Sequence, residues 1–243
     1  MKIFITDGTV ESFFTAVFDA YTDKNCIITS NSKIQLALDC EITQVNCDMQ
    51  KVERVRNGLF RYDKRAEEEI LLVLRSCDIH KEQIAFEYIK KLMQYKSPIR
   101  KRLSLTEVIS FNDTLSKVTG ETHKIKGFLR FMECVGGILY APYSPDNNIT
   151  DLLMYHFTER LKSERFIIHD INRKIAGIYN GRNWTLAYAD KAEIILSENE
   201  KAFENLWKKY YKAVNIEERP HEKQMKGYMP VRYWKFLPEK NPI

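Results

Sequence analysis

The sequence contains no apolar run of the length that a membrane-spanning helix needs, which is roughly 18 uncharged residues. Its first eight residues are not typical of a secretory signal peptide, because their apolar stretch is short and Asp7 interrupts it. We therefore expect a cytoplasmic protein that does not associate with membranes.

Glycine-rich phosphate loops are also missing: neither GxGxxG nor GxxxxGK followed by Ser or Thr occurs, and the chain has only nine glycines. The five cysteines include no CxxC pair, so they lack the spacing of a zinc or iron–sulfur site. In a reducing compartment they are typical of small buried side chains. We therefore expect no metal and no cofactor.

The composition is that of a folded chain, with 44% hydrophobic and 29% charged residues in a length of 243. This length suits one large domain or two modest ones. The formal charge of +5 is unevenly distributed, because the first 60 residues carry six basic and eight acidic side chains. A surface that binds a polyanion is therefore expected outside this first segment.

Hydrophobic spacing predicts a small β-α-β start, with strands at 2–6, 26–29 and 43–47 and a helix that follows an N-cap at Thr9. Helices are predicted at 63–74, 81–95 and 103–118. The segment 90–102 carries six basic residues and no acidic one. It is either a solvated face beside a loop or a surface that contacts phosphates.

From Gly127 the pattern changes to short strands, at 128–133, 138–142, 166–170, 174–179 and 184–188, with a helix at 149–161. Gly136-Gly137 predicts a hairpin turn, and Asn180-Gly181 favours a type I′ turn. A helix at 201–214 and a basic tail follow. The fold class is therefore α+β, with central helices, an antiparallel ββαβββ sheet layer and C-terminal helices. The expected domains are 1–100 and 101–243, unless the two form one continuous domain.

Four polar residues are candidates for a catalytic site, although their geometry cannot be read from spacing. His123 precedes a predicted strand, and Arg130 on that strand must pair with an acid such as Glu133 or Asp170 or else face a ligand. His156 and Arg160 are one helical turn apart and should point the same way. A capping role for His123 and a core position for His156 remain open alternatives.

Aromatic and basic residues alternate in the tail, as in surfaces that stack bases and hold phosphates. The alternative for the tail is a short terminal helix that a tryptophan anchors to the core, and for residues 169–174 it is an exposed tight turn. The candidate nucleic-acid-binding residues are Lys124, Arg130, Arg173, Lys174, Lys226, Arg232, Tyr233, Trp234 and Lys235.

Two segments together carry a family resemblance: residues 122–131, which read THKIKGFLRF, and residues 228–239, which read YMPVRYWKFLPE. The chain resembles a bacterial family described as DNA-metabolism proteins, the domain of unknown function 4130. The resemblance extends over nearly the whole chain and implies a companion subunit for a radical-SAM protein of DNA modification or repair. In some members of that family the domain is fused to a uracil-DNA glycosylase-like domain.

Three functions remain in competition at this stage. The first is a nucleic-acid-binding accessory protein that presents DNA to the radical-SAM partner. The second is a base-processing enzyme, which requires His123, Arg130 and His156 or Arg160 in one pocket. The third is a protein-interaction subunit, which requires a large exposed apolar patch.

Overall fold

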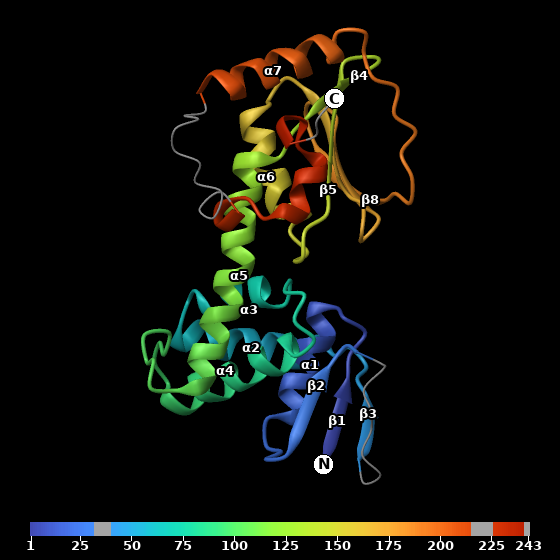
Figure 1. The fold of residues 1–243 in the computed structure, drawn as a ribbon. Coiled ribbons are helices and arrows are strands. Elements are labelled where there is room, and N and C mark those ends of the chain that lie inside the picture. Colours follow the sequence, from blue (N-terminus) through green and yellow to red (C-terminus); the bar gives the residue numbers. More distant parts are fainter. Residues whose placement is uncertain (32–39, 215–225, 241–243) are drawn as a thin grey trace. The chain divides into compact units, whose positions relative to one another are not determined.

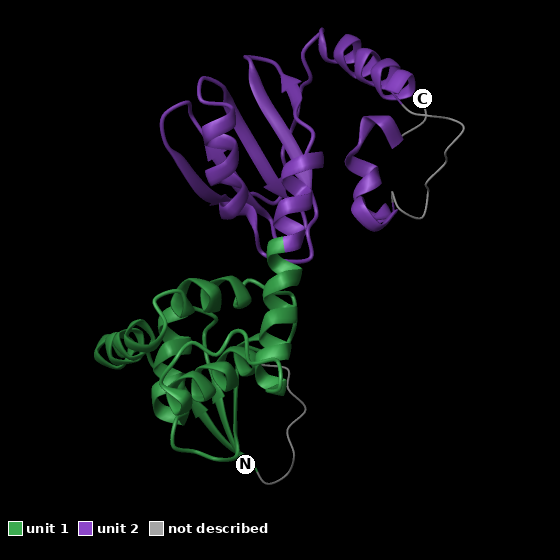
Figure 2. Cartoon of the chain, turned by 90° about the vertical axis from the view of Figure 1, so that its left-hand side faces the viewer, with its two compact units in different colours: residues 1–119 green, residues 120–243 purple. Residues whose placement is uncertain are grey.

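The computed structural model describes residues 1–31, 40–214 and 226–240, and its contacts divide the chain into two compact units, 1–119 and 120–243 (Figure 2). We call them unit 1 and unit 2. The division falls inside helix α5 (Thr106–Phe128), whereas the sequence suggested a break between residues 100 and 101. The mixture of helices and strands in both units confirms the α+β class.

Unit 1 begins with a three-stranded parallel sheet of β1 (Lys2–Ile5), β2 (Cys26–Thr29) and β3 (Glu41–Gln44), in the order β2-β1-β3. Helix α1 (Val10–Ala20) connects β1 to β2. It begins at Thr9, whose side-chain oxygen accepts a hydrogen bond from the backbone N–H of Ser12 at 3.2 Å. The predicted β-α-β start is therefore confirmed.

Helices α2 (Met49–Tyr62), α3 (Ala66–Val73) and α4 (Lys81–Tyr95) complete the core of unit 1 together with the first part of α5. The bounds of α4 are those predicted. Helix α2 was not predicted, because Asn57-Gly58 in its middle resembles a turn. The glycine faces α4, since a Cβ at Gly58 would lie 2.9 Å from Cε at the flexible end of Met93.

Helix α5 runs ten residues beyond its predicted end at residue 118, and the strand predicted at 128–133 is wrong at its start. Gly120 and Gly127 lie within this helix, where their backbone conformation is ordinary and nothing crowds them. His123 is therefore a helical residue and does not precede a strand. Strand β4 begins later and covers Met132–Cys134.

Unit 2 is built on a five-stranded sheet of β4, β5 (Ile138–Tyr143), β6 (Arg165–Asp170), β7 (Ile175–Tyr179) and β8 (Trp184–Tyr188), in sequence order (Figure 1). The ββαβββ order is as predicted, but the sheet is mixed, because β5 and β6 run parallel. Helix α6 (Thr150–Arg160) connects these two strands and packs on β6, β7 and β8. Because helix α6 carries the chain back to the end of the sheet at which β5 starts, β6 runs in the same direction as β5.

The two predicted turns have different outcomes. Gly136 and Gly137 both have positive φ angles, 81° and 67°, so the β4–β5 turn is confirmed. In the β7–β8 turn only Gly181 has a positive φ angle, 91°, whereas a type I′ turn requires it at two successive residues. Asn180 therefore does not adopt the conformation of a type I′ turn, and this prediction is wrong.

After the sheet the chain continues into α7 (Glu200–Val214) and two short 3₁₀ helices, η1 (Val231–Phe236) and η2 (Pro238–Lys240). Helix α7 contacts β4 and η2, and η1 contacts β5. Among the helices in the described parts of the chain, none is both long and apolar enough to span a lipid bilayer.

Candidate functional site

The buried carboxylate of Glu121 on α5 holds the tail against the rest of unit 2. It accepts hydrogen bonds from the backbone N–H groups of Asp146 and Asn147, both at 2.9 Å, and from the Asn147 amide at 2.7 Å. The hydroxyl of Tyr233, in η1, donates to the same carboxylate. Tyr233 is buried and its ring packs on that of Phe128, with centroids 5.3 Å apart. Tyr233 is thus a structural residue.

The electrostatics of this contact favour a charged Glu121. Burial by itself raises the pKa of a carboxyl group, but the donors of Tyr233, Asp146 and Asn147 outweigh it and hold the pKa of Glu121 below its ordinary value. The pKa of the Tyr233 phenol is raised, first by burial and then by its hydrogen bond to the carboxylate. The phenol therefore remains a proton donor at neutral pH.

Two arginines among the predicted phosphate ligands pair with acids of unit 2 instead. Arg232 lies 2.6 Å from Asp146 and 3.4 Å from Glu121. Arg173 lies 3.0 Å from the fully buried carboxylate of Asp170, and it also donates to two backbone carbonyls of the β5–α6 loop. Together these contacts join the tail, the loop and the β6–β7 turn.

Arg130 pairs with Glu239 at 2.9 Å, and not with either acid that the sequence suggested. The second oxygen of Glu239 accepts a hydrogen bond of 2.8 Å from the indole N–H of Trp207. The Arg130 guanidinium also lies over the Trp207 ring, 4.7 Å from its centroid. These three residues attach η2 and α7 to the segment that precedes β4.

His169 and Asp170 are buried in the β6–β7 region, where an exposed turn was one alternative. One ring nitrogen of His169 lies 2.7 Å from the hydroxyl of Tyr140, and the other lies 2.9 Å from the carbonyl oxygen of Ala189. With both nitrogens in hydrogen bonds, His169 links three segments of the sheet. It has the contacts of a core histidine.

Three basic side chains of α5 and α6 interact electrostatically, and we call them the α5–α6 cationic face: Lys126, His156 and Arg160. Burial, followed by the positive charges of Lys126 and Arg160, lowers the pKa of His156 below its ordinary value. Among the described residues, no carboxylate contributes to this shift. The helical spacing had predicted that His156 and Arg160 share a face. Lys126 was missed, because the helix that carries it was expected to end at residue 118.

The other predicted residues are distributed over unit 2. His123 is exposed on α5, three residues before Lys126, and Lys124 donates to the carbonyl oxygen of Gly227 at 3.1 Å. Lys174 lies 2.6 Å from Asp190. The remaining three belong to the tail: the Trp234 indole donates to the carbonyl oxygen of Met229 at 3.0 Å, and the exposed residues are Lys226 and Lys235.

The basic segment 90–102 of unit 1 is partly neutralised by neighbours. Lys91 lies 3.3 Å from Glu107, and Arg100 pairs with the buried Glu69. Lys90 donates to the carbonyl oxygen of Asp23 at 3.0 Å. Two of its six charges are therefore paired with acids of unit 1 and a third is hydrogen-bonded to its backbone, which favours the solvated-face interpretation over a phosphate surface.

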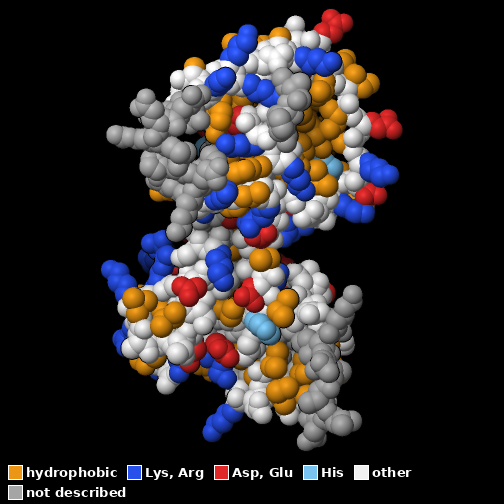
Figure 3. Space-filling view, in the orientation of Figure 1, with side chains coloured by type: hydrophobic (Ala, Val, Ile, Leu, Met, Phe, Trp, Pro, Cys, Tyr) orange, Lys and Arg blue, Asp and Glu red, His pale blue; other side chains and the backbone are white. Residues whose placement is uncertain are grey.

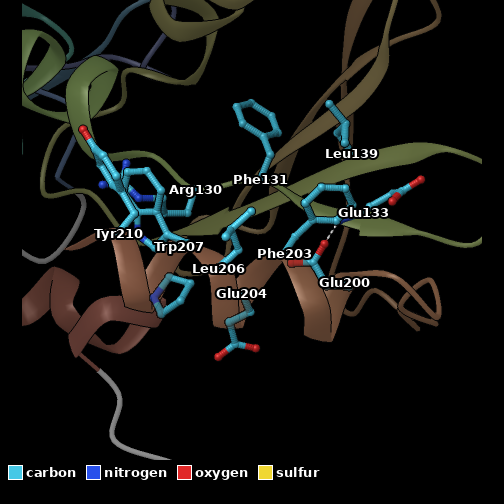
Figure 4. A pocket seen from close by; sticks show the side chains of 11 residues that line it. Arg130, Phe131, Glu133, Leu139, Glu200, Phe203, Glu204, Leu206, Trp207 and Tyr210 are labelled. Carbon is cyan, nitrogen blue, oxygen red and sulfur yellow. Dashed lines mark hydrogen bonds between the residues drawn. The ribbon is translucent and has the colours of Figure 1, made fainter. Parts of the chain in front are cut away.

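A groove of about 820 Å³ lies between α7 and the β4–β5 hairpin, and we call it the α7 groove (Figure 4). Phe203, Leu206 and Trp207 point from α7 toward Phe131 and Leu139 across it. Arg130 is part of its lining, whereas the other three catalytic candidates are not. Within the described ranges, no group of three His, Cys, Asp or Glu side chains is arranged to hold a metal ion.

Comparison with known proteins gives one match. The family model described as a domain of unknown function, DUF4130, matches residues 79–239, which is about two thirds of the chain and includes all of unit 2 up to η2. No curated protein and no solved structure matches the chain.

Proposed function

Because the chain belongs to the DUF4130 family, whose description states no activity, we propose a function from the geometry of unit 2: the chain is a nucleic-acid-binding accessory protein. The α5–α6 cationic face is the observation that carries this proposal. The positive charges of Lys126 and Arg160 both act on His156, and no carboxylate of the described residues contributes to the shift of its pKa. Basic side chains of this kind bind a polyanion favourably, because they neutralise its phosphates and release the counterions bound to them.

The character of the surface supports a phosphate backbone as that anion. Arg160 can donate two parallel hydrogen bonds to one phosphate, and Lys126 supplies a point charge beside it. Arg130, Arg173 and Arg232 are less suited to this role, because each pairs with an acid of the chain itself. The expected contact is therefore with the backbone and independent of base sequence.

The resemblance to bacterial DNA-metabolism proteins makes DNA the expected nucleic acid and a radical-SAM protein the expected partner. A base-processing activity is not part of the proposal. It required His123, Arg130 and either His156 or Arg160 in one pocket, whereas Arg130 lines the α7 groove and the other three residues do not.

We expect the chain to bind a fluorescently labelled DNA fragment with an affinity whose logarithm falls linearly with the logarithm of the salt concentration. Lys126→Gln and Arg160→Gln should each reduce the steepness of this line by about 0.9 and weaken binding about fivefold in low salt. The measurement is fluorescence anisotropy over a series of salt concentrations.

Lys191→Gln provides the matched control, because it removes one exposed charge from the segment after β8. Its affinity and salt dependence should equal those of the wild type. No binding in low salt would refute the proposed function. Binding that both α5–α6 variants retain in full would remove the cationic face from it.

The pH dependence of binding gives a separate prediction for His156. A bound phosphate favours the charged imidazolium, so the pKa of His156 should be higher in the complex than in the free chain, where it is lowered. DNA affinity should therefore rise as the pH falls from about 7.5 to about 5.5. His156→Gln should flatten this rise in the same anisotropy assay. An identical pH profile for wild type and variant would exclude His156 from the interface.

A further inference from the structure

Helix α7 is amphipathic, and such a helix normally buries its apolar side against the protein. In α7 much of that side is exposed to solvent instead. Phe203, Leu206, Tyr210 and Val214 follow one another at helical spacing, and 59%, 64%, 56% and 55% of their respective surfaces are accessible. Hydrophobic side chains also gather on the visible face of unit 2 in Figure 3. A row of large apolar side chains left in water is typical of a surface that another protein covers.

The helix is nonetheless held in place by polar contacts directly beside this row. Glu200 accepts a hydrogen bond of 2.7 Å from the backbone N–H of Glu133 on β4. Trp207 is bound to Glu239, and Tyr211 accepts a hydrogen bond of 2.8 Å from Lys240. The exposed row therefore belongs to an anchored helix that forms one wall of the α7 groove.

Charge is distributed unequally along this part of the chain. The residues that lead into and begin α7, 192–204, contain four acids and one base, whereas residues 205–214 contain three lysines and no acid. The groove is acidic at the same end, where Glu133, Glu200 and Glu204 belong to its lining. An occupant that suits this groove needs an apolar helical face with positive charge at the end that meets these acids.

Helix α7 of another molecule has this chemistry. In an antiparallel pair related by a two-fold axis, the lysine-rich end of each helix meets the acidic end of the other, and the two apolar rows face each other. We propose that a second copy of this chain covers the α7 groove, with the two α7 helices antiparallel. This inference does not depend on the proposed function, because α7 carries no member of the cationic face.

The test is the mass of the full chain in solution, measured by sedimentation or light scattering over a wide concentration range. We expect twice the 28.7 kDa of one chain at high concentration and one chain after dilution. Leu206→Ser should weaken the dimer by at least about tenfold. Its fold should be unchanged, because this side chain is already 64% exposed in the monomer.

Leu103→Ser in unit 1 is the matched control, because Leu103 is 63% exposed and lies outside the groove. Its dimer should equal that of the wild type. A wild-type chain that remains monomeric at about 100 µM would overturn the proposal. In that case an apolar dye that binds wild type but not Leu206→Ser would assign the groove to a different occupant.

Charge reversal tests the antiparallel arrangement. Glu198→Lys with Glu204→Lys makes both ends of the helix basic, and Lys209→Glu with Lys212→Glu makes both ends acidic. Each double variant alone should be monomeric, whereas an equimolar mixture should form a heterodimer. A mixture that stays monomeric while the wild type dimerises would refute the proposed pairing of the helix ends.

Discussion

Replacing Glu121 with glutamine is expected to lower the free energy of unfolding of unit 2 by about 3 kcal/mol, because donors from the β5–α6 loop and from η1 then face a neutral amide that can accept with only one of its two polar atoms. Asp146, Asn147 and Tyr233 all donate to this buried carboxylate. Urea unfolding followed by tryptophan fluorescence measures the loss in unit 2 itself, since Trp184, Trp207 and Trp234 all belong to that unit.

Glu159→Gln is the matched control, because Glu159 and its partner Lys162 are both exposed on unit 2. An exposed ion pair contributes little to stability, so Glu159→Gln should change the free energy of unfolding by less than about 0.5 kcal/mol. Equal effects of the two substitutions would contradict the role assigned to Glu121.

The same contact predicts a dependence on pH. The pKa of Glu121 is depressed in the folded chain from an ordinary value of 4.5. Its stabilisation is therefore complete above that value and is lost as the pH falls through the depressed pKa. The difference between wild type and Glu121→Gln should narrow in acid. A constant difference down to about pH 3 would exclude this linkage.

Replacing Gly177 with alanine should destabilise unit 2 by about 2 kcal/mol, because strand β7 approaches helix α6 too closely there to accept a methyl group. A Cβ at Gly177 would lie 2.4 Å from Sδ and 2.7 Å from Cγ of the buried Met154. The contact fixes how closely α6 packs on the sheet, and with it the position of His156 two residues further along. The same fluorescence assay measures the effect.

Two further variants distinguish this clash from a general cost of alanine. Gly120→Ala is the same substitution in helix α5, where nothing lies within 4 Å of the new Cβ, and it should stabilise by about 0.5 kcal/mol. Met154→Ala should relieve the clash, so the double variant Gly177→Ala with Met154→Ala should be more stable than the sum of the single effects by about 1 kcal/mol. If the effects of the two substitutions on stability were strictly additive, a clash with Met154 would not be the cause of the destabilisation by Gly177→Ala.

Local patterns predicted much of unit 2, because its strands are short and their turns are marked by glycine. The pair Gly136-Gly137 adopts the positive φ angles that a tight turn needs, and strand bounds beside it differ from prediction by few residues. The direction of β6 was not predictable in this way. Whether a strand pairs parallel or antiparallel depends on the path of the connecting helix, which no window of residues contains.

The candidate site was harder to predict than the fold. Tyr233 follows Arg232 in a basic, aromatic segment, and this composition suggested bases and phosphates. Both side chains instead bind Glu121, which lies 112 positions before Tyr233. Composition describes what a side chain can contact, whereas a partner so distant in sequence is fixed by tertiary structure alone. Had helix α5 been predicted to extend to residue 128, the spacing of three positions would have placed Lys126 on the same side of the helix as His123.

The contact between Glu121 and the tail also bears on how unit 2 forms during protein synthesis. The ribosome makes the carboxylate early and its phenol partner more than a hundred residues later. All strands of the β4–β8 sheet are synthesised before η1 and η2. Glu121 and Arg130 therefore cannot form their contacts with the tail until synthesis reaches it. Long-range closure of this kind slows folding and lengthens the time that apolar surface is exposed. Until residues 231–240 are made, unit 2 therefore lacks the contacts that Glu121 and Arg130 form with η1 and η2.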